Sequence, residues 1–277
     1  MNILGLDIGA TKIYYLVYNY PQKRIIYQNK LVYPDLTRNS FETVIDKIKA
    51  ETKKFNYSKV GIGVAGKVKN NRIIYFPNFP ALLNLNFKKY FPIERIYFEN
   101  DANCFSLAEA KIGAGKKYNL IVGFTLGTGF GSGIIFNQKI YHGAFLGGGE
   151  MGHTIVDMQK MQELEDYCSA KFFKSKSVNP EIEENKAKAG NKKSIKIFEE
   201  YGKNLGIAIA NIVNILDPEA VILGGGISKA YSLFISQAKK TAKKLIAYPE
   251  SRKVKILKSK LGKAAGALGA VLICLEE

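Results

Sequence analysis

The chain has 277 residues, 47% of them hydrophobic and 23% charged, so it can bury a sizeable core, and its length favours two domains over one. Its formal charge of +17 admits a polyanionic partner, but the lysines are dispersed, which favours a solvated surface over nucleic-acid binding. The three cysteines lack metal or redox spacing and neither a signal peptide nor a bilayer-spanning run is visible, so we expect a cytoplasmic protein with reduced thiols and no membrane partner.

The first part of the chain predicts an α/β domain that opens with a meander of strands. Three segments rich in Ile, Leu, Tyr and Val predict strands, at residues 3–8, 13–19 and 24–33. Ser40 or Asn39 can cap a helix that ends near Lys54. The runs "KVGIGVAG" and "RIYFEND" then predict two more buried strands.

The second part repeats the opening plan. "LDIGATKIYYLVYN" and "TLGTGFGSGIIFN" both predict a strand, a glycine turn and a second strand, with "SGIIFNQKIYHG" as the second strand of the later copy. An apolar stripe predicts a long helix from about Ser194 to Leu216. A strand "AVILGGG", a helix from about Ser228, a strand "KVKIL" and a terminal helix complete this part.

Glycines and lysines in residues 111–119 predict the boundary between the domains. We expect one α/β domain over residues 1–112, joined by the terminal helix 264–277, and a second over 113–263. Residues 174–193 are the most polar stretch, and we interpret them as a loose surface segment.

The two glycine turns are candidate phosphate-binding loops. Without a Cβ in the way, backbone N–H groups of a glycine turn can converge on an anion, although each turn alone could be an ordinary tight hairpin. The recurrence of the turn, Asp7 ahead of the first copy and "LGGG" after a third strand favour phosphate binding. The candidate nucleotide-binding residues are Asp7, Gly9, Thr11, Lys12, Gly127, Thr128, Gly129, Gly224, Gly225 and Gly226.

The order of several motifs resembles the ROK family of sugar kinases, within the actin, Hsp70 and hexokinase superfamily. The resemblance covers nearly the whole chain and depends on "DIGATK", "GVAGKV", "ENDANC", "TLGTGFGSG", "GGGEMGH", "LEDYCSA", "DPEAVILGGGIS" and "AAGALGA". It implies an α/β fold of two RNase H-like, actin-like ATPase domains around a central cleft. It also implies ATP and Mg²⁺ as cofactors, a sugar and a nucleotide as small-molecule partners, and a homodimer.

Asp101 in "FENDANC" carries the chemistry that the resemblance implies. In such enzymes this aspartate is the general base that takes the proton from the attacking sugar hydroxyl. Read from the residues alone, Asp101 could equally be the N-cap of a helix that begins at Ala102. Asn100 would hydrogen-bond sugar hydroxyls, or would be a turn residue.

Glu150 and His153 lie three residues apart within "GGGEMGHT", a spacing that could serve a metal, a substrate or a structural loop. The resemblance assigns both to sugar hydroxyls, together with Glu165 of "LEDYCSA" and Asn78 of the "PN" pair. Acceptors and donors of this kind suit a polyol, whose hydroxyl groups need partners when they lose water.

The chain departs from the family pattern at two places. Many members carry a cysteine-rich hairpin that binds a structural zinc together with the histidine, whereas no cysteine occurs between His153 and Glu165 here. We therefore expect no zinc and a shortened loop, which affects the pose of His153. Ala10 stands where glycine is usual in the first phosphate turn, and its methyl group could crowd the nucleotide.

These observations predict an ATP-dependent hexose kinase, with glucose as the substrate that the family most often uses and glucose 6-phosphate as the product. N-acetylhexosamines and fructose stay open as substrates, as does a sugar-binding sensor without catalysis. A ROK repressor would need a DNA-binding module ahead of the first strand, and that strand is expected to begin at about Asn2.

Overall fold

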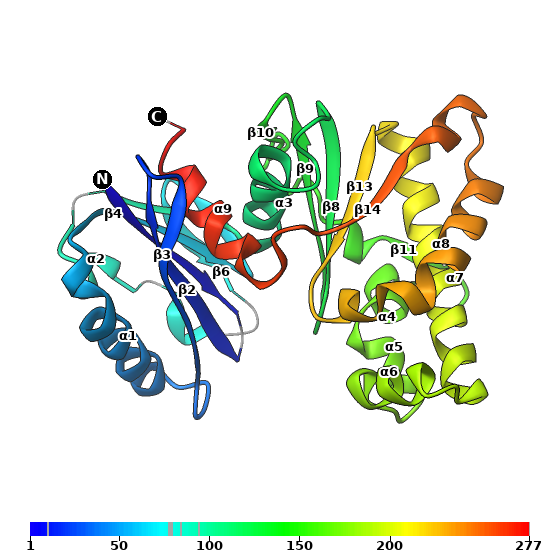
Figure 1. The fold of residues 1–277 in the computed structure, drawn as a ribbon, viewed down its shortest axis with the longest axis horizontal. Helices are drawn as coiled ribbons and strands as arrows, with labels where there is room; N and C mark the ends of the chain where they lie inside the picture. Colours follow the sequence, from blue (N-terminus) through cyan, green and yellow to red (C-terminus); the bar gives the residue numbers. More distant parts are fainter. Residues whose placement is uncertain (10, 77–79, 84, 94, 277) are drawn as a thin grey trace. The chain divides into compact units, whose positions relative to one another are not determined.

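A computed structural model describes residues 1–9, 11–76, 80–83, 85–93 and 95–276 of the chain. The chain divides into two units, each treated separately below (Figure 1). The first unit comprises Met1–Ala108, His142–Gly148 and Lys263–Glu277, and the second comprises Glu109–Tyr141 and Gly149–Gly262. The short segment His142–Gly148 thus belongs to the first unit, whereas the predicted boundaries assign it to the second domain.

The first unit contains a five-stranded sheet flanked by helices. Its elements are β1 (Asn2–Ile8), β2 (Lys12–Asn19), β3 (Arg24–Val32), α1 (Arg38–Thr52), η1 (Lys53–Phe55), β4 (Tyr57–Val64), β5 (Lys67–Lys69), β6 (Arg72–Tyr75), η2 (Pro80–Leu82), α2 (Phe87–Tyr90), β7 (Ile96–Asn100), the start of α3 (Asp101–Ile112), most of η6 (Gly262–Ala264) and α9 (Ala265–Ile273).

The second unit contains another five-stranded sheet and the longest helix among the described residues. Its elements are the end of α3, β8 (Leu120–Leu126), β9 (Phe130–Phe136), β10 (Lys139–Ile140), η3 (Met151–His153), β11 (Ile155–Asp157), β12 (Gln162–Glu163), α4 (Leu164–Cys168), α5 (Ala170–Ser175), α6 (Pro180–Lys188), α7 (Lys192–Leu216), β13 (Ala220–Gly224), η4 (Ile227–Ala230), α8 (Tyr231–Leu245), η5 (Glu250–Lys253) and β14 (Lys255–Lys258).

The two sheets share one topology. The strand order is β3-β2-β1-β4-β7 in the first unit and β10-β9-β8-β13-β14 in the second. In both sheets the first three strands pair antiparallel, and the last two continue parallel to the central strand. The predicted repeat and the α/β fold class are therefore confirmed.

The alternation of side chains along β1 assigns its two faces to different helices. Leu4, Leu6 and Ile8 are buried in the cluster that also contains the apolar face of α1. Gly5, which points to the other face, lies against Ala267 of α9. The C-terminal helix thus packs on the sheet that the N-terminal strand begins.

Glycines allow α9 to approach its neighbours at backbone distance. A Cβ atom at Gly61 of β4 would overlap the carbonyl oxygen of Ala270, and one at Gly269 would overlap the carbonyl oxygen of Cys104 in α3. Lys59 of β4 is buried and donates from Nζ to the carbonyl oxygen of Cys274 at 2.6 Å, which satisfies the C-terminal end of α9.

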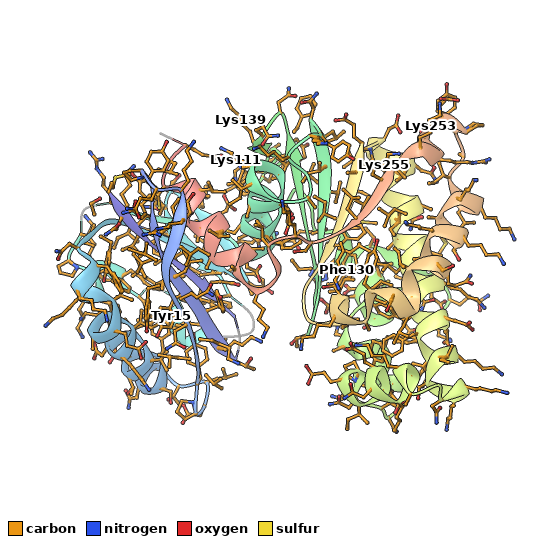
Figure 2. The ribbon with its side chains drawn as sticks, viewed as in Figure 1. Tyr15, Lys111, Phe130, Lys139, Lys253 and Lys255 are labelled. Carbon is orange, nitrogen blue, oxygen red and sulfur yellow. The ribbon has the colours of Figure 1, made fainter. Side chains whose placement is uncertain are left out.

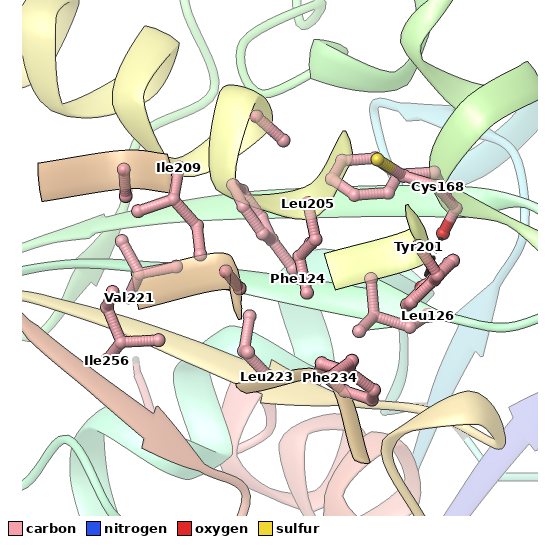
Figure 3. Close-up of a cluster of buried hydrophobic side chains, with 14 of the residues drawn as sticks. Phe124, Leu126, Cys168, Tyr201, Leu205, Ile209, Val221, Leu223, Phe234 and Ile256 are labelled. Atoms are coloured by element: carbon pink, nitrogen blue, oxygen red, sulfur yellow. Dashed lines mark hydrogen bonds between the residues drawn. The ribbon is translucent and has the colours of Figure 1, made fainter. Parts of the chain in front are cut away.

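The core of the second unit lies between its sheet and the helices α7 and α8. Figure 3 shows Phe124, Val221 and Leu223 of the sheet in one cluster with Leu205 and Phe234 of the two helices. All five side chains are buried. The apolar stripe predicted for the long helix is therefore the face that covers this sheet.

Three local predictions are wrong. Thr37 caps α1, because its side chain accepts a hydrogen bond from Ser40 N–H at 3.2 Å, so the cap lies before the predicted residues. Residues 174–193 are largely helical, since Asn179 caps α6 with Pro180 at its first turn. The strand predicted from "SGIIFNQKIYHG" is broken into β9 and β10 by Asn137 and Gln138, both at positive φ.

The lysines are spread over different elements, as the sequence indicates. Figure 2 shows the labelled side chains of Lys139, Lys253 and Lys255, which are exposed and belong to β10, η5 and β14. Lys253 pairs with Glu250 within η5. Within the described residues, no helix is both long enough and apolar enough to cross a membrane.

The close approach of α9 to α3 gives a stability prediction. Gly269→Ala should lower the free energy of unfolding by at least about 2 kcal/mol, because overlap with the Cys104 carbonyl outweighs the roughly 1 kcal/mol that alanine gains in helix propensity. Gly226→Ala is the control, since no atom lies within 4 Å of its Cβ position. Equal unfolding midpoints of the two variants in urea would contradict this packing account.

Candidate functional site

In the first unit, the predicted catalytic and nucleotide residues lie at one edge of the sheet. Strands β1, β4 and β7 run parallel, so their carboxyl ends meet at the same edge. Asp7 lies at the end of β1 in register with Gly63 of β4, and Gly63 is in register with Glu99 of β7. Asp101 follows β7 directly as the first residue of α3.

The carboxyl group of Asp7 is held under the first turn of α9. An added Cβ at Gly266 would lie 2.7 Å from the carboxyl carbon of Asp7, so glycine is needed there to admit this side chain. The pKa of Asp7 is raised to about 7, mainly by burial and also by the negative charge of Asp101, while Lys12 has an opposing effect. Asp7 and Asp101 are therefore close enough to interact electrostatically.

Asn100 stabilises the β7–α3 joint, the junction at which β7 ends and α3 begins, through its side-chain hydrogen bonds. Its Oδ1 accepts hydrogen bonds from Ala102 N–H at 2.9 Å and Asn103 N–H at 3.1 Å, and its Nδ2 donates to the Gly66 carbonyl at 3.1 Å. Asn100 is thus the N-cap of α3, and Asp101 Oδ1 also accepts from Ala102 N–H at 2.9 Å, so both residues bond the first turn of this helix. The amide of Asn100 retains a second N–H that a sugar hydroxyl could accept.

The first glycine turn is closed by its own hydrogen bond. Gly9 N–H donates to the Lys12 carbonyl at 3.0 Å, so in this conformation that N–H does not serve a phosphate oxygen, contrary to its nomination as a donor. The Thr11 carbonyl accepts from Tyr33 N–H at 3.0 Å. The exposed side chains of Thr11 and Lys12 are the parts of this turn that can reach an anion.

The second glycine turn closes in the same way. Gly127 N–H donates to the Gly129 carbonyl at 3.0 Å, and the Gly127 carbonyl accepts from Ala170 N–H at 2.9 Å. The Gly127 N–H is therefore also engaged within its turn, while Thr128 is exposed.

The glycines after β13 lie against the end of β8. Gly225 has φ +84, and a Cβ there would overlap the backbone of Leu126, the last residue of β8. Gly224 is in register with Thr125. The structure thus brings the turn at residues 127–129 and the turn at residues 224–226 together at one edge of the second sheet.

Glu150 and His153 bracket the short helix η3. The carbonyl of Gly149 accepts from the hydroxyl of Ser132, and Met151 N–H donates to the same hydroxyl oxygen at 3.3 Å. These bonds fix the backbone on both sides of Glu150. Both predicted sugar ligands are exposed.

Sequence reasoning did not identify Glu163, which contacts His153. The two side chains meet at 3.0 Å between His153 Nδ1 and Glu163 Oε2. Glu163 is itself held as the N-cap of α4, in a reciprocal capping box with Asp166. No local pattern links residues ten positions apart, so only the pairing of β11 with β12 reveals this contact.

Glu165 joins the sugar-binding candidates to the second glycine turn. Its Oε2 accepts from Phe130 N–H at 2.9 Å, and its Oε1 pairs with Lys171 Nζ at 2.8 Å. That pairing with Glu165 raises the pKa of Lys171. A Cβ at Gly129 would lie 2.6 Å from Glu165 Oε2, so glycine admits the carboxylate at this turn.

Two predicted positions lie outside the described residues, namely Asn78 among the sugar ligands and Ala10 in the first turn. The remaining candidates form two sets, one in each unit. Asp7, Asn100 and Asp101 accompany the first turn, and the other carboxylates and His153 accompany the second.

The residues that follow His153 do not fit a zinc site. Among the described residues, no group of three or more His, Cys, Asp or Glu side chains could hold a metal ion. The short β11–β12 hairpin supplies no thiol, and Cys168 is fully buried in the core, where burial raises its pKa. The predicted absence of a structural zinc stays a prediction.

The raised pKa of Asp7 predicts a pH-dependent cost to stability. The folded state binds the Asp7 proton more tightly than the unfolded state does, so stability is lost as the pH rises from about 4 through about 7. Asp7→Asn should therefore stabilise the protein more at pH 8 than at pH 5, by about 2 kcal/mol. Urea unfolding of both proteins at the two pH values tests this, and a pH-independent difference would contradict it.

Known proteins match nearly the whole length of the chain. The sequence profile of the ROK family matches residues 3–277. The N-acetyl-D-glucosamine kinase of Mannheimia succiniciproducens is 29% identical in an alignment 313 positions long, which covers 99% of this chain and 100% of that relative.

Solved structures match over the same extent. A ROK family glucokinase from Streptomyces griseus, in complex with glucose and AMPPNP, is 25% identical with a TM-score of 0.87, and the match covers 100% of both chains. The ROK hexokinase of Thermus thermophilus is 22% identical with a TM-score of 0.78, over 98% of this chain and 97% of that one, and shows the shared fold.

Proposed function

Because the chain belongs to the ROK family and is a sugar kinase, we propose that it transfers the γ-phosphoryl group of ATP to the 6-hydroxyl group of a hexose. The observation that carries the proposal is the placement of Asp101 beside Asp7 at the carboxyl edge of the first sheet. The hydrogen bonds of Asn100 cap the start of α3, and Asp101, the first residue of that helix, accepts from Ala102 N–H at 2.9 Å.

Asp101 acts as the general base in this proposal. It accepts the proton of the sugar hydroxyl while the hydroxyl oxygen forms its bond to the γ-phosphorus, and ADP leaves. Most of the catalysis in phosphoryl transfer comes from positioning and charge neutralisation, so one placed carboxylate suffices. The negative charge of Asp101 is one cause of the raised pKa of Asp7, so the two carboxylates interact.

The nucleotide is held by the turns and by the side chains beside them. Thr11 and Lys12 of the first turn, Thr128 and Gly129 of the second turn, and residues 224–226 are the proposed phosphate ligands. A bound Mg²⁺ would neutralise phosphate charge, and a carboxylate with phosphate oxygens suits this hard cation. Asp7, at the first turn, is the residue that we assign to hold it.

The residues that we propose to bind the sugar are Glu150, His153, Glu165 and Asn100. Since Nδ1 of His153 contacts Glu163, its Nε2 is the ring nitrogen that remains to bond a sugar hydroxyl. Glu163 thereby fixes which nitrogen faces the substrate.

We place N-acetyl-D-glucosamine first among substrates and glucose second. The curated relatives of similar length named N-acetyl-D-glucosamine kinase support the first. The Streptomyces griseus glucokinase, which carries glucose in its structure, supports the second. Glucose as the main substrate, the expectation from the family resemblance, thus becomes the alternative.

Turnover with a panel of sugars tests the proposed function. Purified protein with ATP and Mg²⁺ should release ADP in the presence of N-acetyl-D-glucosamine or glucose, and much less without a sugar. Asp101→Asn should lower turnover by at least ~100-fold, the usual scale for loss of a general base, and should leave sugar binding detectable. Near-normal turnover of this variant would remove Asp101 from the role of base.

A binding experiment separates sugar ligands from nucleotide ligands. Glu150→Ala and His153→Ala should each weaken sugar binding by about 1 to 3 kcal/mol, since each truncation leaves hydroxyl groups unpaired. Binding of an ATP analogue should change much less, and added zinc should restore nothing. Calorimetric titration of both ligands into both variants measures this. Unchanged sugar affinity would leave residues 147–154 as a structural loop.

A further inference from the structure

His142 stands at the point where the chain returns to the first unit. Residues 142–148 belong to that unit, whereas Tyr141 and Gly149 on either side belong to the second. The returning segment is closed on itself, because Gly148 N–H donates to the His142 carbonyl at 2.8 Å. Gly143 and Leu146 have φ +72 and +62, as a tight loop requires. Glu150 follows two residues after the loop.

The ring of His142 contacts Glu99, which precedes Asn100 at the β7–α3 joint. His142 Nε2 lies 2.7 Å from Glu99 Oε2, and the Glu99 side chain is only 13% exposed. The other carboxylate oxygen of Glu99 accepts from Asn100 N–H at 2.8 Å and from Asn103 Nδ2 at 3.0 Å. One carboxylate therefore ties the returning loop to the start of α3.

The electrostatics favour the charged form of both partners of this pair. The hydrogen bond to Glu99 raises the pKa of His142 above its ordinary value. Burial raises the pKa of Glu99, but the bonds from His142, Asn103 and Asn100 together outweigh it and lower that pKa. The pair thus joins a mostly buried carboxylate to an imidazole whose side chain is 41% exposed, and its hydrogen bond is stronger when the imidazole is protonated.

We propose that His142 and Glu99 are positioning residues, which fix the β7–α3 joint so that Asp101 meets the sugar hydroxyl in reactive geometry. This proposal rests on the proposed phosphoryl transfer. Glu99 bonds the backbone of Asn100 and the side chain of Asn103, which flank Asp101 on both sides. His142 acts through Glu99, because it completes the bonding of a carboxylate that would otherwise be buried without its cationic partner.

Steady-state kinetics with the sugar that the wild type prefers test the proposal. His142→Ala should lower kcat by about 10-fold or more, since small misplacement of a reacting group is costly, while the KM values for sugar and ATP stay within about twofold. His142→Gln, whose amide can still donate to Glu99, should recover much of the loss. Glu276→Gln is the matched control, because Glu276 also acts on the charge of His142, and its kcat should be unchanged.

A second measurement needs no turnover. The chain has two histidines, so His153→Ala leaves one imidazole signal for a titration by nuclear magnetic resonance. The pKa of His142 should lie above 6.5 in that variant and fall towards it when Glu99→Gln is added. The carboxylates that act on His142 in the described residues are Glu99 and Glu276, and the Glu276→Gln control separates them.

The outcomes distinguish this inference from the proposed function. A wild type without sugar-dependent turnover would reject the function, whereas an active wild type with unchanged kcat in folded His142→Ala would reject the positioning role. If His142→Ala does not fold, His142→Gln and Glu99→Gln provide the test. Equal kcat values for these two variants would reject the positioning role. A rise in KM with kcat unchanged would also overturn the proposal. If the pKa of His142 does not change when Glu99→Gln is added, the pair does not form.

Discussion

The parallel alignment of strands is the constraint on which the rest of this structure depends. In each sheet the third, fourth and fifth strands run in one direction, so the turns that follow them meet at one edge. In the first unit this brings together Asp7 and Asp101, which are 94 positions apart in the chain. In the second unit it brings two glycine turns together. The strand topology therefore brings the candidate site residues together, and their side chains then determine what chemistry is available there.

The alignment in the first unit has a cost that specific residues offset. Asp7 is held in surroundings that disfavour its charge, next to a second carboxylate. Room for it depends on Gly266, and the seam of α9 against β4 and α3 depends on Gly61 and Gly269. A helix made mainly of Ala, Gly and Leu is thus an essential part of the site, because it allows a close backbone approach that larger residues would prevent.

Periodic and ordered features could be predicted from the sequence, and long-range side-chain contacts could not. The strands, the long helix and the doubled glycine turn follow from residue patterns that one segment contains. Donation by Gly9 N–H to Lys12 depends on how the turn closes, which its composition does not reveal. The Asn179 cap before Pro180 is a helix signal that the sequence contains, whereas the interpretation of residues 174–193 as a loose segment considered only their polarity. Contacts such as Glu99 with His142, 43 residues apart, need the folded chain.

The central claim is that this chain transfers a phosphoryl group from ATP to a sugar hydroxyl group. Phosphorus nuclear magnetic resonance of a reaction with ATP, Mg²⁺ and N-acetyl-D-glucosamine or glucose tests it most directly, because the spectrum identifies the product. We expect the γ-phosphate signal to disappear as a phosphomonoester signal, coupled to the two protons on C6 of the sugar, appears in equal amount. Accumulation of inorganic phosphate without a sugar phosphate, or ATP that stays intact with every sugar, would contradict the account.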